Sequence, residues 1–232
     1  MPNPQNFSST DSRFKIFASE NEVFEYTAQI ITEIVKHALT KRSTCNVIVA
    51  AGNSVTKSLG CLTPATLNWQ LVNWFLADER CVDNNNNNLR NELQIIQALQ
   101  NTLGEKFGVV TSPQAEIQPQ EAAAAYASRI KSINMFDFCL LGMGDDGHIA
   151  SLTPGNSSLN SDETCLLIND SPNPPSQRIT LGMRVLRNTT NRILVTTGGS
   201  KNKALKKIER DLMSPVQIFD PTTIVVDRAA VQ

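Results

Sequence analysis

The stretch LLGMGDDGHIASLTP, residues 140–154, places three glycines, two carboxylates and one of the two histidines of the chain close together. The apolar run Phe136–Leu141 leads into it and has the pattern of a buried strand whose carboxyl end opens onto glycine. Open α/β sheets bind ligands at this end of their strands. The sequence therefore predicts a site here, where glycines admit a ligand to the backbone and His148 offers a group that exchanges protons near neutral pH.

Two other interpretations of this stretch stay open. A glycine-rich turn can serve only to reverse the chain, with the histidine as a satisfied structural group. Asp145, Asp146 and His148 could instead be metal ligands, although no second histidine lies nearby and no paired cysteines follow a zinc pattern. A carboxylate pair beside an imidazole is costly to bury without a purpose, which favours a functional site.

The composition is that of an ordinary globular protein, with 232 residues, 41% hydrophobic residues and a net charge of −1. We expect one domain over residues 1–232, with a loose N-terminus over residues 1–13, which are polar and contain two prolines. The charge balance and the lack of a basic stripe argue against nucleic acid or an anionic membrane as a partner. The expected ligand is a small molecule.

The sequence also indicates a cytoplasmic protein. No apolar run approaches the ~20 residues of a membrane span, and the polar N-terminus lacks the apolar core of a signal peptide. Five widely spaced cysteines without a Cys-x-x-Cys pair argue against a disulfide framework. Cys81, beside a charged triplet, is the cysteine to test for reactivity.

Apolar runs that fit buried strands alternate with segments of helical periodicity. The expected strands are 45–50, 71–76, 108–110, 136–141, 164–168, 192–196 and 224–227, and the expected helices are 19–39, 89–103, 121–133 and 203–213. Ser19 and Glu22 have the spacing of a capping box for the first helix. This alternation predicts an α/β fold of Rossmann-like, three-layer form, with a mostly parallel sheet and helices on both faces.

Polar or glycine-rich loops follow four of the predicted strands, namely Gly52–Ser54, Asp78–Arg80, Gly142–His148 and Gly198–Lys201. Gly52, Asn53 and Ser54 could bind an anion or simply cap a helix. Arg80 has a planar fork suited to phosphate, with Asp78 or Glu79 as its partner or as a contact for sugar hydroxyls, although for the triplet by itself a solvated ion pair is the favoured explanation. The convergence of the four loops is what predicts a site.

Two common catalytic motifs are missing. No G-x-G-x-x-G opens a strand-helix unit, so a nicotinamide or flavin cofactor is not supported. No G-x-S-x-G elbow is present, and Ser151 falls in a helix predicted to follow His148.

The polar blocks resemble those of the 6-phosphogluconolactonase family, within the wider group that includes glucosamine-6-phosphate deaminase. Asp78–Val82 is similar to its D-E-R-x-V block, and Gly142–Pro154 to its G-M-G-x-D-G-H-x-A-S-L-x-P block. Asp170–Pro172 together with Arg178–Thr180 resembles its D-S-P and R-I-T block. The resemblance covers nearly the whole chain in order.

The resemblance implies hydrolysis of 6-phospho-D-glucono-1,5-lactone to 6-phospho-D-gluconate, in the oxidative pentose phosphate pathway, without a metal or organic cofactor. It implies a catalytic role for His148, and Asp145 or Asp146 would orient the imidazole. Arg80, Arg178 and Lys201 would hold the phosphorylated sugar acid, with Gly52, Asn53, Ser54, Asp78 and Gly144 also expected at the substrate. We expect a monomer or a weak homo-oligomer.

The chain departs from the family pattern in its first loop, where Ala51–Thr56 stands in place of S-G-G-S-T-P. Two alternative functions follow from the resemblance. An aminosugar-phosphate deaminase would continue its histidine loop into F-N-E-P, but Thr153 stands at the glutamate position. A sugar-phosphate sensor without catalysis would keep the pocket, and only a comparison of binding with turnover separates it from an enzyme.

Overall fold

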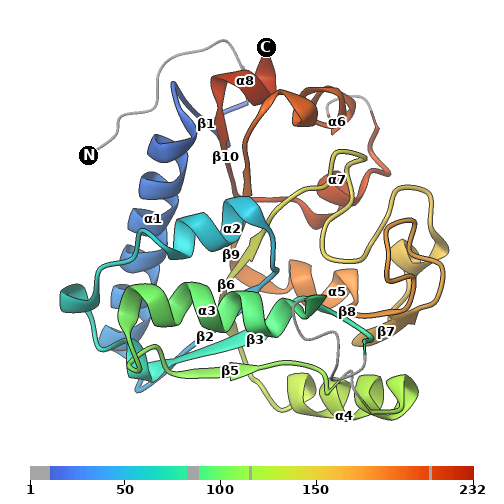
Figure 1. Ribbon diagram of the computed structural model, residues 1–232, viewed down its shortest axis with the longest axis horizontal. Helices are drawn as coiled ribbons and strands as arrows, with labels where there is room; N and C mark the ends of the chain where they lie inside the picture. Colours follow the sequence, from blue (N-terminus) through green and yellow to red (C-terminus); the bar gives the residue numbers. More distant parts are fainter. Residues whose placement is uncertain (1–10, 83–88, 115–116, 209–210) are drawn as a thin grey trace.

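The computed structural model describes residues 11–82, 89–114, 117–208 and 211–232. Within these residues, seven strands form one sheet in the order β1-β10-β9-β6-β2-β3-β5, and all its pairs are parallel (Figure 1). The strands are β1 Phe14–Phe17, β2 Cys45–Val49, β3 Val72–Leu76, β5 Val109–Thr111, β6 Phe136–Leu141, β9 Thr189–Thr196 and β10 Thr223–Asp227. The predicted parallel sheet is confirmed. β1, which the sequence did not predict, pairs with β10.

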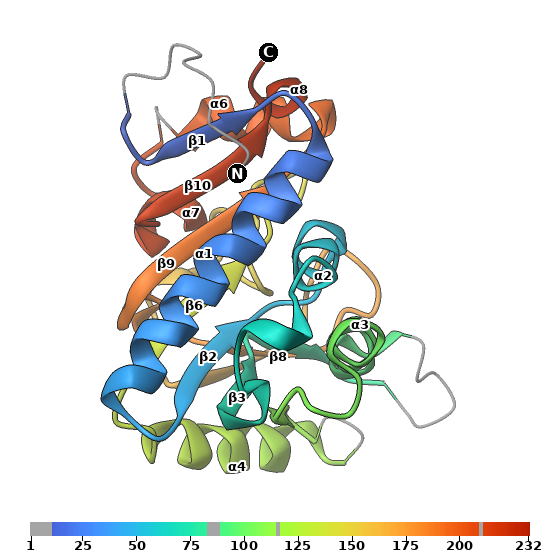
Figure 2. The ribbon, with the colours of Figure 1, turned by 90° about the vertical axis from the view of Figure 1, so that its left-hand side faces the viewer.

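Helices cover both faces of this sheet, as predicted. The face of Val47 and Val49 packs under α1 (Glu20–Lys41), α2 (Asn53–Leu59) and α3 (Asn91–Leu103), and Figure 2 shows α1 lying across that face. The face of Ile48 packs against α4 to α8 and a second, smaller sheet. These helices are α4 Pro119–Lys131, α5 Met183–Arg187, α6 Asn202–Ile208, α7 Pro215–Phe219 and α8 Arg228–Val231. Alternate side chains of each strand thus enter opposite cores.

The capping box of the first helix is confirmed. The Glu22 amide donates to Ser19 Oγ at 3.4 Å, and the Ser19 amide donates to Glu22 Oε2 at 3.0 Å. The predicted helix 203–213 is wrong in its second half, because α6 ends at Ile208 and residues 211–213 are not helical. Asp211 instead accepts the amide of Met213 at 3.0 Å, a local bond that competes with a helix.

The second sheet is the main departure from the predicted fold. β4 (Asp78–Arg80), β8 (Arg178–Leu181) and β7 (Cys165–Ile168) pair antiparallel in the order β4-β8-β7. The sequence predicted a loop at residues 78–80, but the chain changes sheets at Ala77. The Ala77 amide donates to Val49 of the large sheet at 2.8 Å, and the Ala77 carbonyl accepts from Leu181 at 2.7 Å.

Two predicted loops fall partly or wholly outside the described residues. Of the expected loose N-terminus, residues 1–10 lie outside them, whereas residues 11–13 form a turn before β1. The run of asparagines at residues 84–88, which its polar composition predicts to be a surface loop, also lies outside them. Among the helices that the structure does describe, none combines the length and apolar character that a bilayer crossing needs.

Candidate active site

One cavity of about 400 Å³ opens at the carboxyl ends of the parallel strands, and all four predicted loops line it. The predicted site residues that line it are Gly52, Asn53, Ser54, Asp78, Arg80, Gly144, His148, Arg178 and Lys201. Asp145 and Asp146 are not part of this lining but contact two of its members, Lys201 and His148. The structure therefore brings together residues from β4, β8 and three separate loops.

The His148 imidazole is held by a neighbouring carboxylate. Asp146 Oδ1 lies 2.6 Å from His148 Nδ1 and also accepts the His148 backbone amide at 3.0 Å. Burial raises the pKa of Asp146, but its hydrogen bonds with His148 outweigh burial, and the net pKa is lowered. Asp146 thus stays ionised and fixes the ring. His148 Nε2 has no protein partner within the described residues, so it is available to a ligand.

Gly144 makes room for this imidazole. A Cβ atom built at position 144 would lie 2.2 Å from both Cε1 and Nδ1 of His148 and 2.7 Å from Asp146 Oδ1. Non-bonded carbon atoms pack at about 3.5–4.0 Å. Only glycine therefore lets the ring and its carboxylate partner lie against the backbone of the turn.

Asp145 has a different contact from Asp146. Its Oδ1 lies 2.5 Å from Lys201 Nζ and accepts from Ser200 Oγ at 3.1 Å. The hydrogen bond from Lys201 lowers the pKa of Asp145 below its usual range. Of the two carboxylates that the sequence left as alternatives, Asp146 is the one that contacts the imidazole.

Two arginines face each other across the small sheet. Arg80 of β4 is directly opposite Arg178 of β8 in the antiparallel register, and both line the cavity. Like charges in directly opposite positions destabilise a sheet. Arg178 is 7% exposed, and burial lowers its pKa, with Asp78 opposing that shift. A bound anion would offset the repulsion between the two guanidinium groups, which makes the pair a candidate phosphate site.

Asp78 is almost fully buried between these cations and the histidine loop. Its Oδ2 accepts from Ser151 Oγ at 2.7 Å, and the Ser151 side chain is itself buried. Burial raises the pKa of Asp78, while Ser151, Arg178, His148 and Arg80 all act in the opposite direction. The predicted helix around Ser151 is wrong. Ala150 takes a φ of 49°, and Ile149 and Leu152 form a bridge that closes a turn, which points Ser151 at Asp78.

Glu79 points away from the cavity and holds the first turn of α3. Its Oε1 accepts the amides of Arg80 and Asn91, both at 2.7 Å, and its Oε2 accepts the amide of Glu92 at 2.8 Å. The side chain has no exposed surface. Its role is structural, because it joins β4 to α3 and so fixes the position of Arg80 between them.

Glu79 should make stability depend on pH. Burial raises the pKa of Glu79 to about 7, above the value of an unfolded glutamate, so the folded state holds this proton more tightly. The contribution of Glu79 to the free energy of unfolding is complete below about pH 4.5 and is lost as the pH rises through 7. We expect the unfolding free energy of wild type to fall by up to about 3 kcal/mol relative to Glu79→Gln between pH 5 and 8. Urea denaturation at several pH values measures this difference, and a constant difference would contradict it.

Several lining residues escaped the sequence analysis. Glu20, Asn91 and Thr197 line the cavity but belong to none of the motifs that the sequence analysis singled out. The alternative that Asn53 or Ser54 only caps a helix is wrong. Gly52 is the N-cap of α2, with a φ of 143°, and no side chain caps the helix. Cys81, the cysteine singled out for a test of reactivity, is half-buried, and burial raises its pKa to about 11, which disfavours the thiolate.

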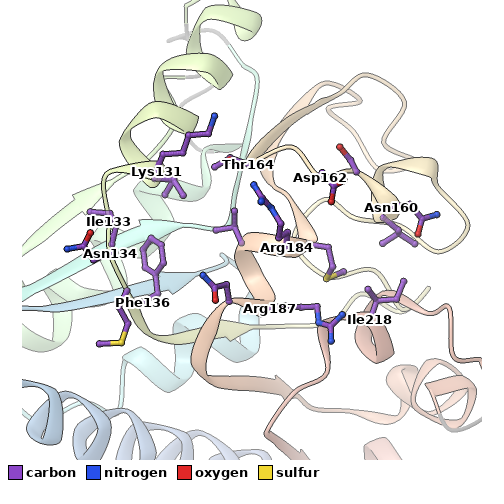
Figure 3. A pocket seen from close by; sticks show the side chains of 17 residues that line it. Lys131, Ile133, Asn134, Phe136, Asn160, Asp162, Thr164, Arg184, Arg187 and Ile218 are labelled. Carbon is purple, nitrogen blue, oxygen red and sulfur yellow. The ribbon is translucent and has the colours of Figure 1, made fainter.

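A second, larger cavity of about 820 Å³ lies at the opposite edge of the sheet (Figure 3). It is lined by Phe136 at the amino end of β6, by Arg184 and Arg187 of α5, and by Asp162, all of which are labelled in Figure 3. Its lining contains no histidine and no predicted site residue. The described residues also contain no group of three or more histidine, cysteine, aspartate or glutamate side chains placed to hold a metal ion. The chemistry-bearing groups thus gather in the smaller cavity.

The fold and this cavity define a class. A parallel α/β sheet carries, at its carboxyl edge, an imidazole held by a carboxylate and three cations suited to an anionic substrate, as in α/β enzymes that act on phosphorylated small molecules. Residues 18–229 match the model of the family described as glucosamine-6-phosphate isomerases/6-phosphogluconolactonase. The chain belongs to this family, and the resemblance seen in its motifs is confirmed.

Individual relatives agree with this assignment. The chain is 31% identical over 235 residues to a probable 6-phosphogluconolactonase of Drosophila melanogaster, covering 92% of this chain and 91% of that protein. It is 31% identical over 209 residues to the 6-phosphogluconolactonase of Homo sapiens, covering 84% and 81%. Its fold is similar to the crystal structure of the Thermotoga maritima 6-phosphogluconolactonase, with a TM-score of 0.81, 24% identity, and coverage of 92% and 98%.

Proposed function

We propose that this protein hydrolyses 6-phospho-D-glucono-1,5-lactone to 6-phospho-D-gluconate. The observation that carries the proposal is the single cavity in which His148, positioned by Asp146, faces the same space as Arg80, Arg178 and Lys201. A phosphorylated lactone needs both halves of this site, a proton-transfer group at its carbonyl and cations at its phosphate. The human relative is a 6-phosphogluconolactonase, and the Drosophila relative is described as a probable one.

His148 acts as the general base in this mechanism. In this mechanism Nδ1–H donates a hydrogen bond to the Asp146 carboxylate, so Nε2 presents its lone pair to a water molecule in the cavity. Nε2 takes a proton from the water as the oxygen attacks the lactone carbonyl and forms a tetrahedral intermediate. The C–O bond to the ring oxygen then breaks, and the imidazolium returns the proton to that oxygen. A single histidine thus serves first as the base and then as the acid, and it ends the cycle in its starting protonation state.

The oxyanion is stabilised mainly by cationic side chains. Backbone amides of the glycine turn could also donate to an oxyanion, but two of them already have partners within the turn. The Gly144 amide donates to the His148 carbonyl at 2.9 Å, and the Gly147 amide donates to the Gly144 carbonyl at 3.0 Å. Arg178 lines the same cavity as His148, and its fixed charge acts on the developing oxyanion through space, without contact, in a partly desolvated pocket that screens it weakly.

The phosphate binds Arg80, Arg178 and Lys201, with Asn53 and Ser54 of the first loop beside them. Asp78, buried between Arg178 and the histidine loop, accepts a hydrogen bond from a hydroxyl group of the sugar. The arginine forks supply paired N–H donors that match phosphate oxygens. The protein thereby holds the substrate by its phosphate, at the end remote from the reacting carbonyl, and this orients the carbonyl toward His148.

A comparison of two lactones tests this function. We expect the kcat/KM for freshly generated 6-phosphoglucono-δ-lactone to exceed that for glucono-δ-lactone by about a hundredfold or more, because the unphosphorylated compound offers no anion to the arginines of the cavity. Rates are corrected for spontaneous opening of each lactone. Equal kcat/KM values for the two lactones would contradict the proposed phosphate site. Release of ammonia from glucosamine 6-phosphate would favour the deaminase alternative.

The remaining features of the proposal concern the whole chain. We place residues 1–232 in one domain, supported by the pairing of β1 with β10, which joins the two ends of the described chain. We place the protein in the cytoplasm, supported by five cysteines that are all unpaired. The cavity is lined by residues of one chain, so a monomer or weak homo-oligomer suffices for activity.

A further inference from the structure

Lys201 enters the cavity with its charge already paired. Its Nζ lies 2.5 Å from Asp145 Oδ1, and Ser200 Oγ donates to the same oxygen at 3.1 Å. Asp145 comes from the loop after β6, and the two donors come from the 3₁₀ turn Gly199–Lys201 after β9. The Lys201 side chain is 20% exposed and the Asp145 side chain 65% exposed, so the carboxylate covers the ammonium from the solvent side.

The two arginines of the cavity are in a different state. Arg178 donates from Nε and Nη2 to the carbonyls of Pro175 and Asn173 at 3.1 and 3.0 Å, and Arg80 donates from Nη1 to the carbonyl of Leu89 at 2.8 Å. Neither forms a salt bridge within 4.0 Å in the part of the chain that the structure describes. Neutral carbonyls leave their positive charge available to an anion. Lys201 alone among the three is neutralised by contact with a carboxylate.

We propose that Asp145 competes with the substrate phosphate for Lys201 and so determines how tightly this protein holds phosphorylated sugar acids. The inference rests on the proposed function and adds a residue that sets affinity without touching the reacting atoms. An ammonium has three donors, so phosphate and Asp145 can reach it together, but the two anions then repel each other. Asp145 can move into solvent when phosphate arrives and return when the product leaves. It therefore weakens binding and speeds release.

Neutralising Asp145 should tighten anion binding. We expect Asp145→Asn to lower the Kd for 6-phosphogluconate about two- to fivefold at low ionic strength, as for a partly exposed charge pair. The gain should shrink in 0.5 M salt, because solvent-exposed charges are screened. In a Lys201→Met background the same substitution should have no effect. Calorimetric titration gives the four Kd values, and Asp162→Asn, at the opposite edge of the sheet, is the matched control.

Inorganic phosphate as a second probe separates this inference from the proposed function. If the chain does not hydrolyse the lactone but Asp145→Asn still tightens phosphate binding, the function fails and the inference stands. Unchanged or weaker binding by Asp145→Asn, with an unaltered melting temperature, would overturn the inference even if hydrolysis is normal. An equal gain in the Lys201→Met background would overturn it too. Asp145→Ser repeats the test should the asparagine variant fold poorly.

Discussion

Replacing His148 by alanine is expected to lower kcat for 6-phosphoglucono-δ-lactone by about 10²–10⁴, the usual loss when a general acid-base group is removed. The physical reason is the position of the ring. Asp146 Oδ1 holds Nδ1 at 2.6 Å, and the opposite nitrogen is left for water. No other histidine lies in the cavity, so no neighbouring imidazole can take over the proton transfer. Binding of 6-phosphogluconate should change less than fivefold, because the cations that hold phosphate remain.

Stopped-flow measurement of proton release gives the rate, after subtraction of spontaneous lactone opening. His37→Ala is the matched control, since the second histidine is exposed on α1, far from the cavity lining, and its loss should leave kcat unchanged. Wild-type turnover by His148→Ala would refute the general-base role. A large loss of 6-phosphogluconate binding would instead assign His148 to ground-state binding.

The parallel sheet could be predicted because its evidence is local. Runs such as Phe136–Leu141 are apolar apart from Asp137, and a central parallel strand is buried on both faces, so its position follows mainly from hydrophobicity. The capping box at Ser19 follows from a spacing of three residues in the same way. The meeting of the four loops follows from the rule that parallel strands share one carboxyl edge.

The small sheet could not be predicted because its evidence is non-local. Asp78–Arg80 is a charged triplet with no alternation of polar and apolar residues, and it becomes a strand only through pairing with Arg178–Leu181, about a hundred positions later. β1 has the same origin, since four residues near the N-terminus become a strand only beside β10. The placement of Arg80 opposite Arg178 therefore needed the structure.

The choice between Asp145 and Asp146 also lay beyond the sequence. Both precede His148 by a few residues, and spacing alone permits either to reach the ring. The backbone decides, because Gly147 takes a φ of 92° and its amide closes the turn onto the Gly144 carbonyl. This turn directs Asp146 to the imidazole and Asp145 to Lys201. Likewise, the helix expected at Ser151 does not form, because Ala150 takes a positive φ that is incompatible with a right-handed helix.

The turn at Gly144 leads to a second variant with a large effect. Gly144→Ala is expected to lower kcat by about 10²-fold or more, toward the level of His148→Ala, in a protein that still folds. The added Cβ would lie 2.2 Å from two atoms of the His148 ring and 2.7 Å from Asp146 Oδ1. Gly144 has no positive φ, so alanine fits its backbone conformation, and the ring must give way instead.

Movement of the ring by even 1 Å breaks its geometry with both Asp146 and the attacking water, and misplacement of that size can cost about 10² in rate. Gly199→Ala is the matched control, because its Cβ would lie 3.7 Å from the nearest atom, the Ala229 carbonyl oxygen, in ordinary contact. Initial rates and 6-phosphogluconate titrations of both variants are the measurement. Wild-type kcat in Gly144→Ala would mean that catalysis does not depend on where this imidazole lies. A loss of kcat with product binding retained ties the glycine of the motif to the position of its histidine.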